Sequence, residues 1–208
     1  MLSMLRISQK TFAICGIISP FIFAILIIIA GLFRPEYSHL VNFVSELGAV
    51  GASYAIIQRI NFMLVGFLII VFAIGLHKGI AKGKGSIIGP LLVGIFGLSA
   101  VLSGIFSTDP IQPGSFSDNM HMLSSAIGST AAIIGFFVIS DRLEKNSSWK
   151  GFRHFSILIA VVAILVSVVG NGILGVLGYP GLSQRLYMAV LFLWIEVMAI
   201  HLFQISSQ

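Results

Sequence analysis

Charged side chains are scarce in this sequence. Only 9% of its 208 residues are Asp, Glu, Lys or Arg, whereas 57% are hydrophobic, and the mean hydropathy is +1.05. A chain of this size cannot bury so many apolar side chains in one water-soluble core. The composition therefore excludes an ordinary soluble protein and predicts an integral membrane protein.

Cysteine is nearly absent, and so is any alternation of apolar and polar residues. The single cysteine, Cys15, excludes an intrachain disulfide. A membrane β-barrel would need segments in which every second residue is apolar, but the apolar runs here are long and unbroken. We therefore predict an all-α fold.

Six apolar runs are long enough to cross a bilayer. A helix rises about 1.5 Å per residue, so about 20 residues cross a hydrocarbon core about 30 Å thick. We predict a single domain over residues 1–208, a polytopic bundle of six transmembrane helices at residues 11–33, 60–80, 87–106, 120–140, 155–177 and 186–203. Segment 34–59 is too polar to span the membrane, and Pro35 and Gly48 bracket a short interfacial helix within it.

Lysine and arginine are distributed unequally between the two sides of this bundle. Three lie on one side (Arg34, Arg59 and Arg185) and nine on the other (Arg6, Lys10, Lys78, Lys82, Lys84, Arg142, Lys145, Lys150 and Arg153). Basic residues favour the cytoplasmic side of a membrane protein. We therefore predict a multi-pass protein of the cell membrane with both termini in the cytoplasm. The net charge of +5 then reflects topology, and we predict no nucleic-acid partner.

Polar and charged residues gather near the expected outer boundary of the bundle. The hairpin between the third and fourth spans carries Asp109, Asp118 and His121, and below it Ser125 and Ser129 lead polar groups into the bilayer. The candidate binding residues are Ser45, Glu46, Arg59, Asp109, His121 and Arg185. These residues predict a small outward-facing cluster of mixed charge.

The first functional hypothesis is a non-catalytic protein that binds a membrane lipid or a small amphiphilic ligand. Arg59 and Arg185 would hold an anionic headgroup, while Glu46 and Asp109 would orient the two arginines or bind a cationic group. The structural alternative is that these charges form ion pairs that only seal the top of the bundle. We prefer the ligand-binding interpretation.

A membrane-embedded hydrolase is an alternative, with His121 as the base and Asp109 or Asp118 as its partner. Asp118, His121 and Ser125 share one helical face, but no hydrolase motif such as GxSxG or HExxH supports this chemistry. A metal site would have suitable ligand types in His39, Glu46, Asp109 and His121, but no pair has a recognised metal spacing. We therefore predict neither a metal nor a cofactor.

One acidic residue, Glu196, lies near the middle of the sixth span. An ionisable group at that depth is costly and is by default a functional candidate. It would support a small proton-coupled transporter, or it would be a neutral acid that ties helices together. Its candidate neighbours are Ser129 and Thr130 and, nearer the outer side, Asn171.

Three short motifs carry a family resemblance. They are SELGA at residues 45–49, FSTDP at residues 106–110 followed by His121, and GLSQR at residues 181–185. In this order, on one side of six predicted spans, they resemble the membrane proteins grouped as Domain of Unknown Function 998. The resemblance covers nearly the whole chain. It implies a six-helix fold and carries no assigned activity or catalytic residue.

Overall fold

The computed structural model describes residues 8–80 and 82–207, and within these ranges its secondary structure is entirely helical. Arg6, one of the nine residues assigned to the basic side, lies outside the described residues. Six helices are long and apolar enough to cross a membrane: α1 (Gln9–Leu32), α2 (Ala55–Gly79), α3 (Gly85–Ile105), α4 (Phe116–Glu144), the run Phe152–Val176, and α7 (Pro180–Ile205). The predicted all-α, multi-pass membrane fold is confirmed.

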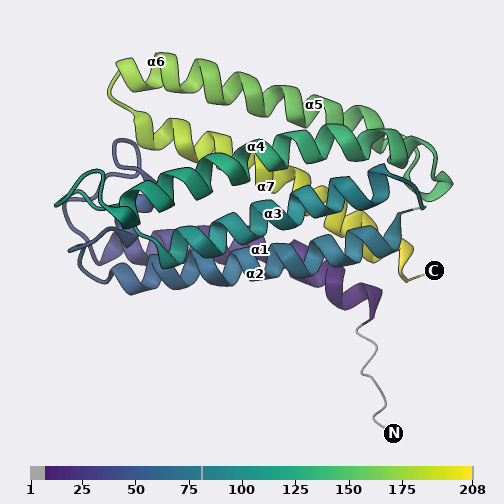
Figure 1. Ribbon diagram of the computed structural model, residues 1–208, viewed down its shortest axis with the longest axis horizontal. Helices are drawn as coiled ribbons and strands as arrows, with labels where there is room; N and C mark the ends of the chain where they lie inside the picture. Colours follow the sequence, from purple (N-terminus) through teal and green to yellow (C-terminus); the bar gives the residue numbers. More distant parts are fainter. Residues whose placement is uncertain (1–7, 81, 208) are drawn as a thin grey trace, which may run out of the picture.

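The helices run side by side along the long axis of the molecule (Figure 1). Helix α1 packs on α2 and α7, α3 packs on α2 and α4, and the fifth span packs on α4. Both described chain ends lie at one end of the bundle, which we call the terminal end. Residues 33–54, 106–115 and 177–179 connect helices at the opposite end, which we call the hairpin end.

Small residues allow the close approach of α2 and α3. A Cβ atom on Gly66 would lie 2.4 Å from the carbonyl oxygen of Gly97, and a Cβ on Gly97 would lie 2.7 Å from the carbonyl oxygen of Gly66. On the other side of the core, the rings of Phe136 and Trp194 stack with centroids 4.0 Å apart. Glycine contacts and aromatic stacking are both means by which helices pack closely when lipid is the solvent.

Two spans contain irregular turns. Pro20 lacks an N–H, so the carbonyl of Gly16 loses its helical partner, and the Ser19 hydroxyl donates to that carbonyl instead at 2.9 Å. Helix α1 continues through this point. The fifth span consists of α5 (Phe152–Leu165), the π-helical turn η3 (Val166–Gly170) and α6 (Asn171–Val176).

The predicted interfacial helix over residues 35–48 is not confirmed. The connection between α1 and α2 consists of turns and one five-residue 3-10 helix, η1 (Val44–Gly48). Contacts with α7 explain the difference, because the carbonyls of Leu40 and Val41 accept hydrogen bonds from the amides of Leu182 and Gly181. These carbonyls bond to another element in place of a helical partner in their own segment.

Candidate functional site

The three sequence motifs meet at the hairpin end. The amide of Val50, next to SELGA, donates to the carbonyl of Thr108 in FSTDP at 2.9 Å. The amide of Val44 donates to the side chain of Gln184 in GLSQR at 2.6 Å. Three segments far apart in the sequence therefore pack together at one place.

Arg185 occupies the centre of this region, in the second turn of α7. Its Nη1 donates to the carbonyls of Asn42 and Gly181, each at 2.9 Å. Its Nη2 contacts the Tyr37 hydroxyl and lies 3.2 Å from Nδ1 of His39. All four partners are neutral groups. Among the described residues, no carboxylate lies within ion-pair distance of Arg185, whose positive charge is therefore not neutralised by a side chain.

The two side chains that contact Arg185 are held in their uncharged forms. A guanidinium can only donate, so Nδ1 of His39 accepts and the proton of the neutral ring is on Nε2. Burial and the nearby Arg185 charge both lower the pKa of His39 below its ordinary value. Burial raises the pKa of Tyr37, although the Arg185 charge opposes this. Neutral pH therefore leaves Arg185 as the charged group of this trio.

The other charged candidates bind backbone groups or an uncharged side chain rather than one another. The Glu46 carboxylate accepts from the Asn42 side-chain amide and the Phe43 amide, each at 2.8 Å. Nε of Arg59 donates to the carbonyl of Gly48 at 2.9 Å. The Asp109 carboxylate accepts from the amides of the two residues that follow Pro110, at 3.2 and 2.9 Å. These three residues therefore stabilise loops at the hairpin end. The ion pair found among the described residues is elsewhere, between Arg153 and Asp141 at the terminal end.

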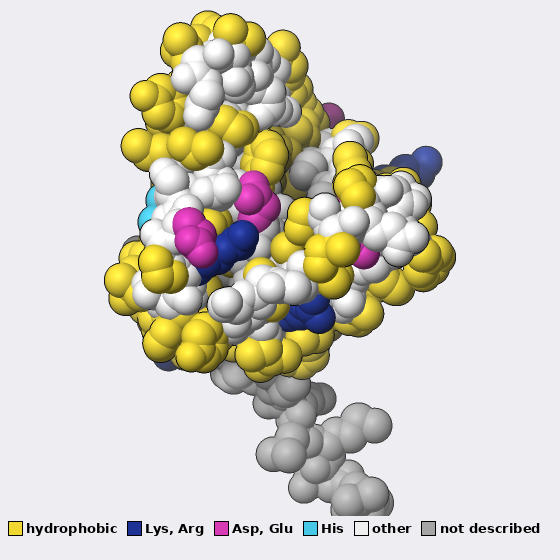
Figure 2. All heavy atoms as spheres, turned by 90° about the vertical axis from the view of Figure 1, so that its left-hand side faces the viewer, with side chains coloured by type: hydrophobic (Ala, Val, Ile, Leu, Met, Phe, Trp, Pro, Cys, Tyr) yellow, Lys and Arg dark blue, Asp and Glu magenta, His cyan; other side chains and the backbone are white. Residues whose placement is uncertain are grey.

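Figure 2 looks onto the hairpin end and shows how little charge is exposed there. A small group of acidic and basic side chains is surrounded by hydrophobic and uncharged polar atoms. Such a surface suits the boundary between a membrane and water, where apolar area contacts lipid and the few charges contact headgroups.

His121 is anchored by carbonyl groups and not by an acid. Its Nδ1 lies 3.2 Å from the carbonyl oxygen of Ser103 and 2.9 Å from that of Phe106. Carbonyls only accept, so Nδ1 carries the proton. Asp118 instead accepts from the amides of Asp109 and Gly114, at 3.1 and 3.0 Å. Among the described residues, no hydrogen bond therefore joins His121 to Asp109 or Asp118.

The four candidate metal ligands are not brought together. His39 contacts Arg185, while Glu46, Asp109 and His121 each bind the separate partners given above. Within residues 8–80 and 82–207, no group of three or more His, Cys, Asp and Glu side chains is arranged to hold a metal ion.

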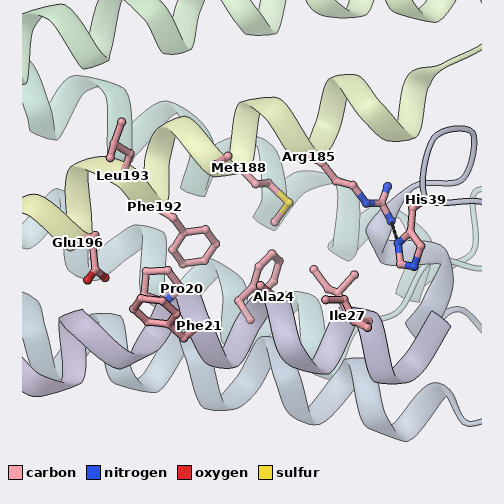
Figure 3. A pocket seen from close by; sticks show the side chains of 13 residues that line it. Pro20, Phe21, Ala24, Ile27, His39, Arg185, Met188, Phe192, Leu193 and Glu196 are labelled. Atoms are coloured by element: carbon pink, nitrogen blue, oxygen red, sulfur yellow. Dashed lines mark hydrogen bonds between the residues drawn. The ribbon is translucent and has the colours of Figure 1, made fainter. Parts of the chain in front are cut away.

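A long groove runs between α1 and α7, and we call it the α1–α7 groove. Its volume is about 540 Å³. Arg185 and His39 lie at one end and Glu196 lies at the other, with apolar side chains between them (Figure 3). The remaining lining residues are Pro20, Phe21, Phe23, Ala24, Ile27, Ile28, Met188, Ala189, Phe192 and Leu193.

A second, smaller space lies among α2, α3, α4 and α7, and we call it the inner cavity. Its volume is about 120 Å³. Four of the predicted residues line it, namely Ser45, His121, Ser125 and Ser129. The single outer pocket expected from the sequence is thus divided, with Arg185 lining the α1–α7 groove and His121 the inner cavity.

Glu196 and its predicted neighbours do not form a cluster. One carboxylate oxygen of Glu196 is buried and has no hydrogen-bond partner among the described residues. Asn171 is exposed at the start of α6 and accepts a hydrogen bond from the Ser183 hydroxyl at 3.0 Å. Ser129 lines the inner cavity.

Sequence reasoning missed Tyr37 and Gln184. Tyr37 is an aromatic residue in the polar loop next to the end of α1, and its place in the sequence gives no sign that it contacts Arg185. Gln184 lies within the GLSQR motif, beside the arginine that was recognised. That adjacency was a usable signal, because a polar side chain within a recognised motif is a candidate for the same site.

Comparison with known proteins is informative at the level of the family alone. The family described as "Protein of unknown function (DUF998)" matches residues 17–201. No curated protein and no solved structure matches the chain. The three segments that meet at the hairpin end all lie within the matched range. This multi-pass membrane protein belongs to the DUF998 family.

Proposed function

We propose that this protein binds a lipid or a single-chain amphiphile with an anionic headgroup in the α1–α7 groove. One observation carries the proposal. A cation without a carboxylate partner, Arg185, lies at the end of an apolar groove that continues alongside α7 to Glu196.

The groove has the length and chemistry of an acyl-chain site. Arg185 and Glu196 are 11 positions apart on α7, so the helix rise separates them by about 16 Å. This is close to half of a hydrocarbon core of about 30 Å, which is the depth of one leaflet. The groove is also open at its side, because the lining residues Phe21 and Ile28 are 59% and 56% exposed. A chain can therefore enter from the membrane.

The headgroup end supports an anion. Arg185 is fixed by neutral partners, so its charge is available to a phosphate or carboxylate beside it. The neutral His39 ring adds an Nε2–H donor at the same end of the groove. With the charge bias of the sequence placing the hairpin end outside, the ligand would come from the outer leaflet of the cell membrane.

Filling the groove tests the proposal. The exposed Ala24 and Ala189 both line it, and Ala24→Phe and Ala189→Phe place a ring where the chain would lie. Ala126→Phe is the matched control, because Ala126 is exposed on α4 and is not a lining residue of the groove. The readout is the number of lipids per protein retained in mild detergent, by native mass spectrometry.

We expect each groove-filling variant to lose at least half of the retained lipid and the control to resemble the wild type. Equal lipid content in all four proteins would overturn the proposal. Gel filtration measures the amount of folded, monodisperse protein in each sample, so that misfolding of a variant is not counted as a loss of binding.

A second candidate function is proton-coupled transport. The observation that favours it is the buried, unpartnered oxygen of Glu196 at the apolar end of the groove. If Glu196 carries a proton, a pH gradient across reconstituted vesicles should drive uptake of the groove's ligand, and Glu196→Gln should abolish it. Uptake that is unchanged in Glu196→Gln would remove the support for transport.

A further inference from the structure

We propose that the inner cavity is a second binding site, for a small uncharged molecule that carries several hydroxyl groups. The proposal is separate from lipid binding in the α1–α7 groove. It depends on the polar lining of the cavity, on the unused nitrogen of His121, and on the size of the space.

The polar lining of the inner cavity has no Asp, Glu, Lys or Arg among the residues that the structure describes. Hydroxyl, amide and imidazole groups line it together with apolar side chains. The polar residues are Ser45, Ser99, Ser103, His121, Ser125, Ser129, Gln184 and Tyr187. A charged ligand in such a site would be removed from water without a counter-charge, at a high cost. A hydroxyl-bearing ligand would find both donors and acceptors.

His121 supplies the most specific feature of the lining. The ring is only 6% exposed, and Nδ1 donates to two carbonyls. In the neutral ring Nε2 is then an acceptor, and no described residue donates a hydrogen bond to it. An acceptor beside a cavity can be satisfied by a ligand that carries a donor, such as a hydroxyl group.

The serines of α3 and α4 extend this pattern. The Ser103 hydroxyl lies 3.2 Å from the hydroxyls of both Ser124 and Ser125. Gln184 accepts from the amide of Val44 through Oε1, which leaves its NH₂ group as a donor beside the cavity. The lining thus combines one fixed acceptor with hydroxyls that can rotate to donate or accept.

The volume sets the size of the ligand. The cavity volume of about 120 Å³ is enough for several water molecules. A polyol of three or four carbons has a similar size. The rings of Phe23, Phe62, Phe96 and Phe192 also line the cavity and would pack against the C–H groups of such a molecule.

Glycerol is the probe that tests this proposal. Saturation-transfer NMR on the purified protein, in a detergent without a sugar headgroup, measures transfer from protein to glycerol. Ser129→Leu replaces a lining hydroxyl with apolar bulk. Thr130→Leu is the matched control, because Thr130 is the next residue on α4, is exposed and is not a lining residue.

We expect Ser129→Leu to reduce the saturation-transfer signal at least fivefold and Thr130→Leu to leave it unchanged. Equal signals in both variants and the wild type would show that the cavity holds water only, and would overturn the proposal. Lipid retention is measured on the same samples. Unchanged lipid with lost glycerol transfer separates this site from the α1–α7 groove.

A second pair of variants protects the test against misfolding. His121→Asn keeps an N–H near the position of Nδ1, and so retains a donor to the Ser103 and Phe106 carbonyls, but it removes the Nε2 acceptor. His121→Gln places its amide nearer the position of Nε2. We expect glycerol transfer to fall in His121→Asn and to persist in part in His121→Gln. The reverse order, in folded proteins, would contradict the role assigned to Nε2.

Discussion

Nη1 of Arg185 donates a hydrogen bond of 2.9 Å to the backbone carbonyl of Asn42, which is 143 positions away in the sequence. The bond joins the start of α7 to the connection between α1 and α2. Arg185 therefore has a structural task and an electrostatic task. Its guanidinium holds the loop, and it also places a positive charge at the end of the α1–α7 groove.

The structural task predicts that lysine is a poor substitute. Arg185→Lys keeps the charge but loses the planar fork that reaches both Asn42 and Tyr37. Loss of hydrogen bonds made by a charged group costs about 1.5–3 kcal/mol of unfolding free energy. We expect a lower thermal midpoint, followed by the fluorescence of the buried Trp149 and Trp194. Arg153→Lys, at an exposed ion pair, is the control and should change little.

The electrostatic task predicts a change in ligand preference. In Arg185→Gln, the groove remains but the positive charge at its end is gone. We expect the ratio of anionic to zwitterionic lipid retained by the protein to fall severalfold, as counted by lipid mass spectrometry. Arg185→Lys should retain the wild-type ratio despite its lower stability. Identical ratios in all three proteins would rule out headgroup recognition by this charge.

Acid should weaken the hairpin end through His39. In the unfolded chain, His39 takes up a proton near pH 6.5. In the folded protein, burial and the Arg185 charge lower the pKa of His39. In the interval below about pH 6.5 the unfolded state therefore binds more protons, and stability falls as the pH falls. We expect the thermal midpoint to decrease between about pH 7.5 and pH 5 and this decrease to be smaller in His39→Asn, which keeps an acceptor for Arg185. An equally steep profile in His39→Asn would assign the effect to other groups.

Gly181 should not tolerate a side chain. A Cβ atom there would lie 2.3 Å from the carbonyl oxygen of Asn42. Overpacking of this kind costs about 1–3 kcal/mol, so Gly181→Ala should unfold at a lower temperature. Gly172→Ala is the matched control, because no atom of residues 8–80 or 82–207 is recorded within 4 Å of its added Cβ. Alanine also favours helix by up to about 1 kcal/mol over glycine, so the control should be as stable as the wild type or more so.

The six spans could be predicted from the sequence because hydropathy is a local property. Each apolar run must become a helix to satisfy its own backbone in lipid, whatever the other runs do. The connection between α1 and α2 could not be predicted in the same way. Its conformation depends on hydrogen bonds to Gly181 and Leu182, and no pattern within residues 34–59 refers to them.

The candidate site was likewise predictable only in part from the sequence. Arg185 and His121 were both predicted near one boundary of the bundle, and in the structure both lie at the hairpin end. Their separation into two cavities depends on side chains such as Phe23, Met188 and Phe192, which line both spaces and form the wall between them. Apolar residues of this kind carry no individual signal in a sequence that is 57% hydrophobic.

The bonds of Arg59 and Arg185 with backbone carbonyls have one more consequence. Ion pairs between exposed side chains weaken as ionic strength rises, because mobile ions screen them within about 10 Å at 0.1 M salt. Short hydrogen bonds from a charged side chain to fixed, partly buried peptide groups are much less exposed to that screening. The hairpin end should therefore keep its shape in dilute and in concentrated salt alike, which suits a surface that meets whatever solution lies outside the membrane.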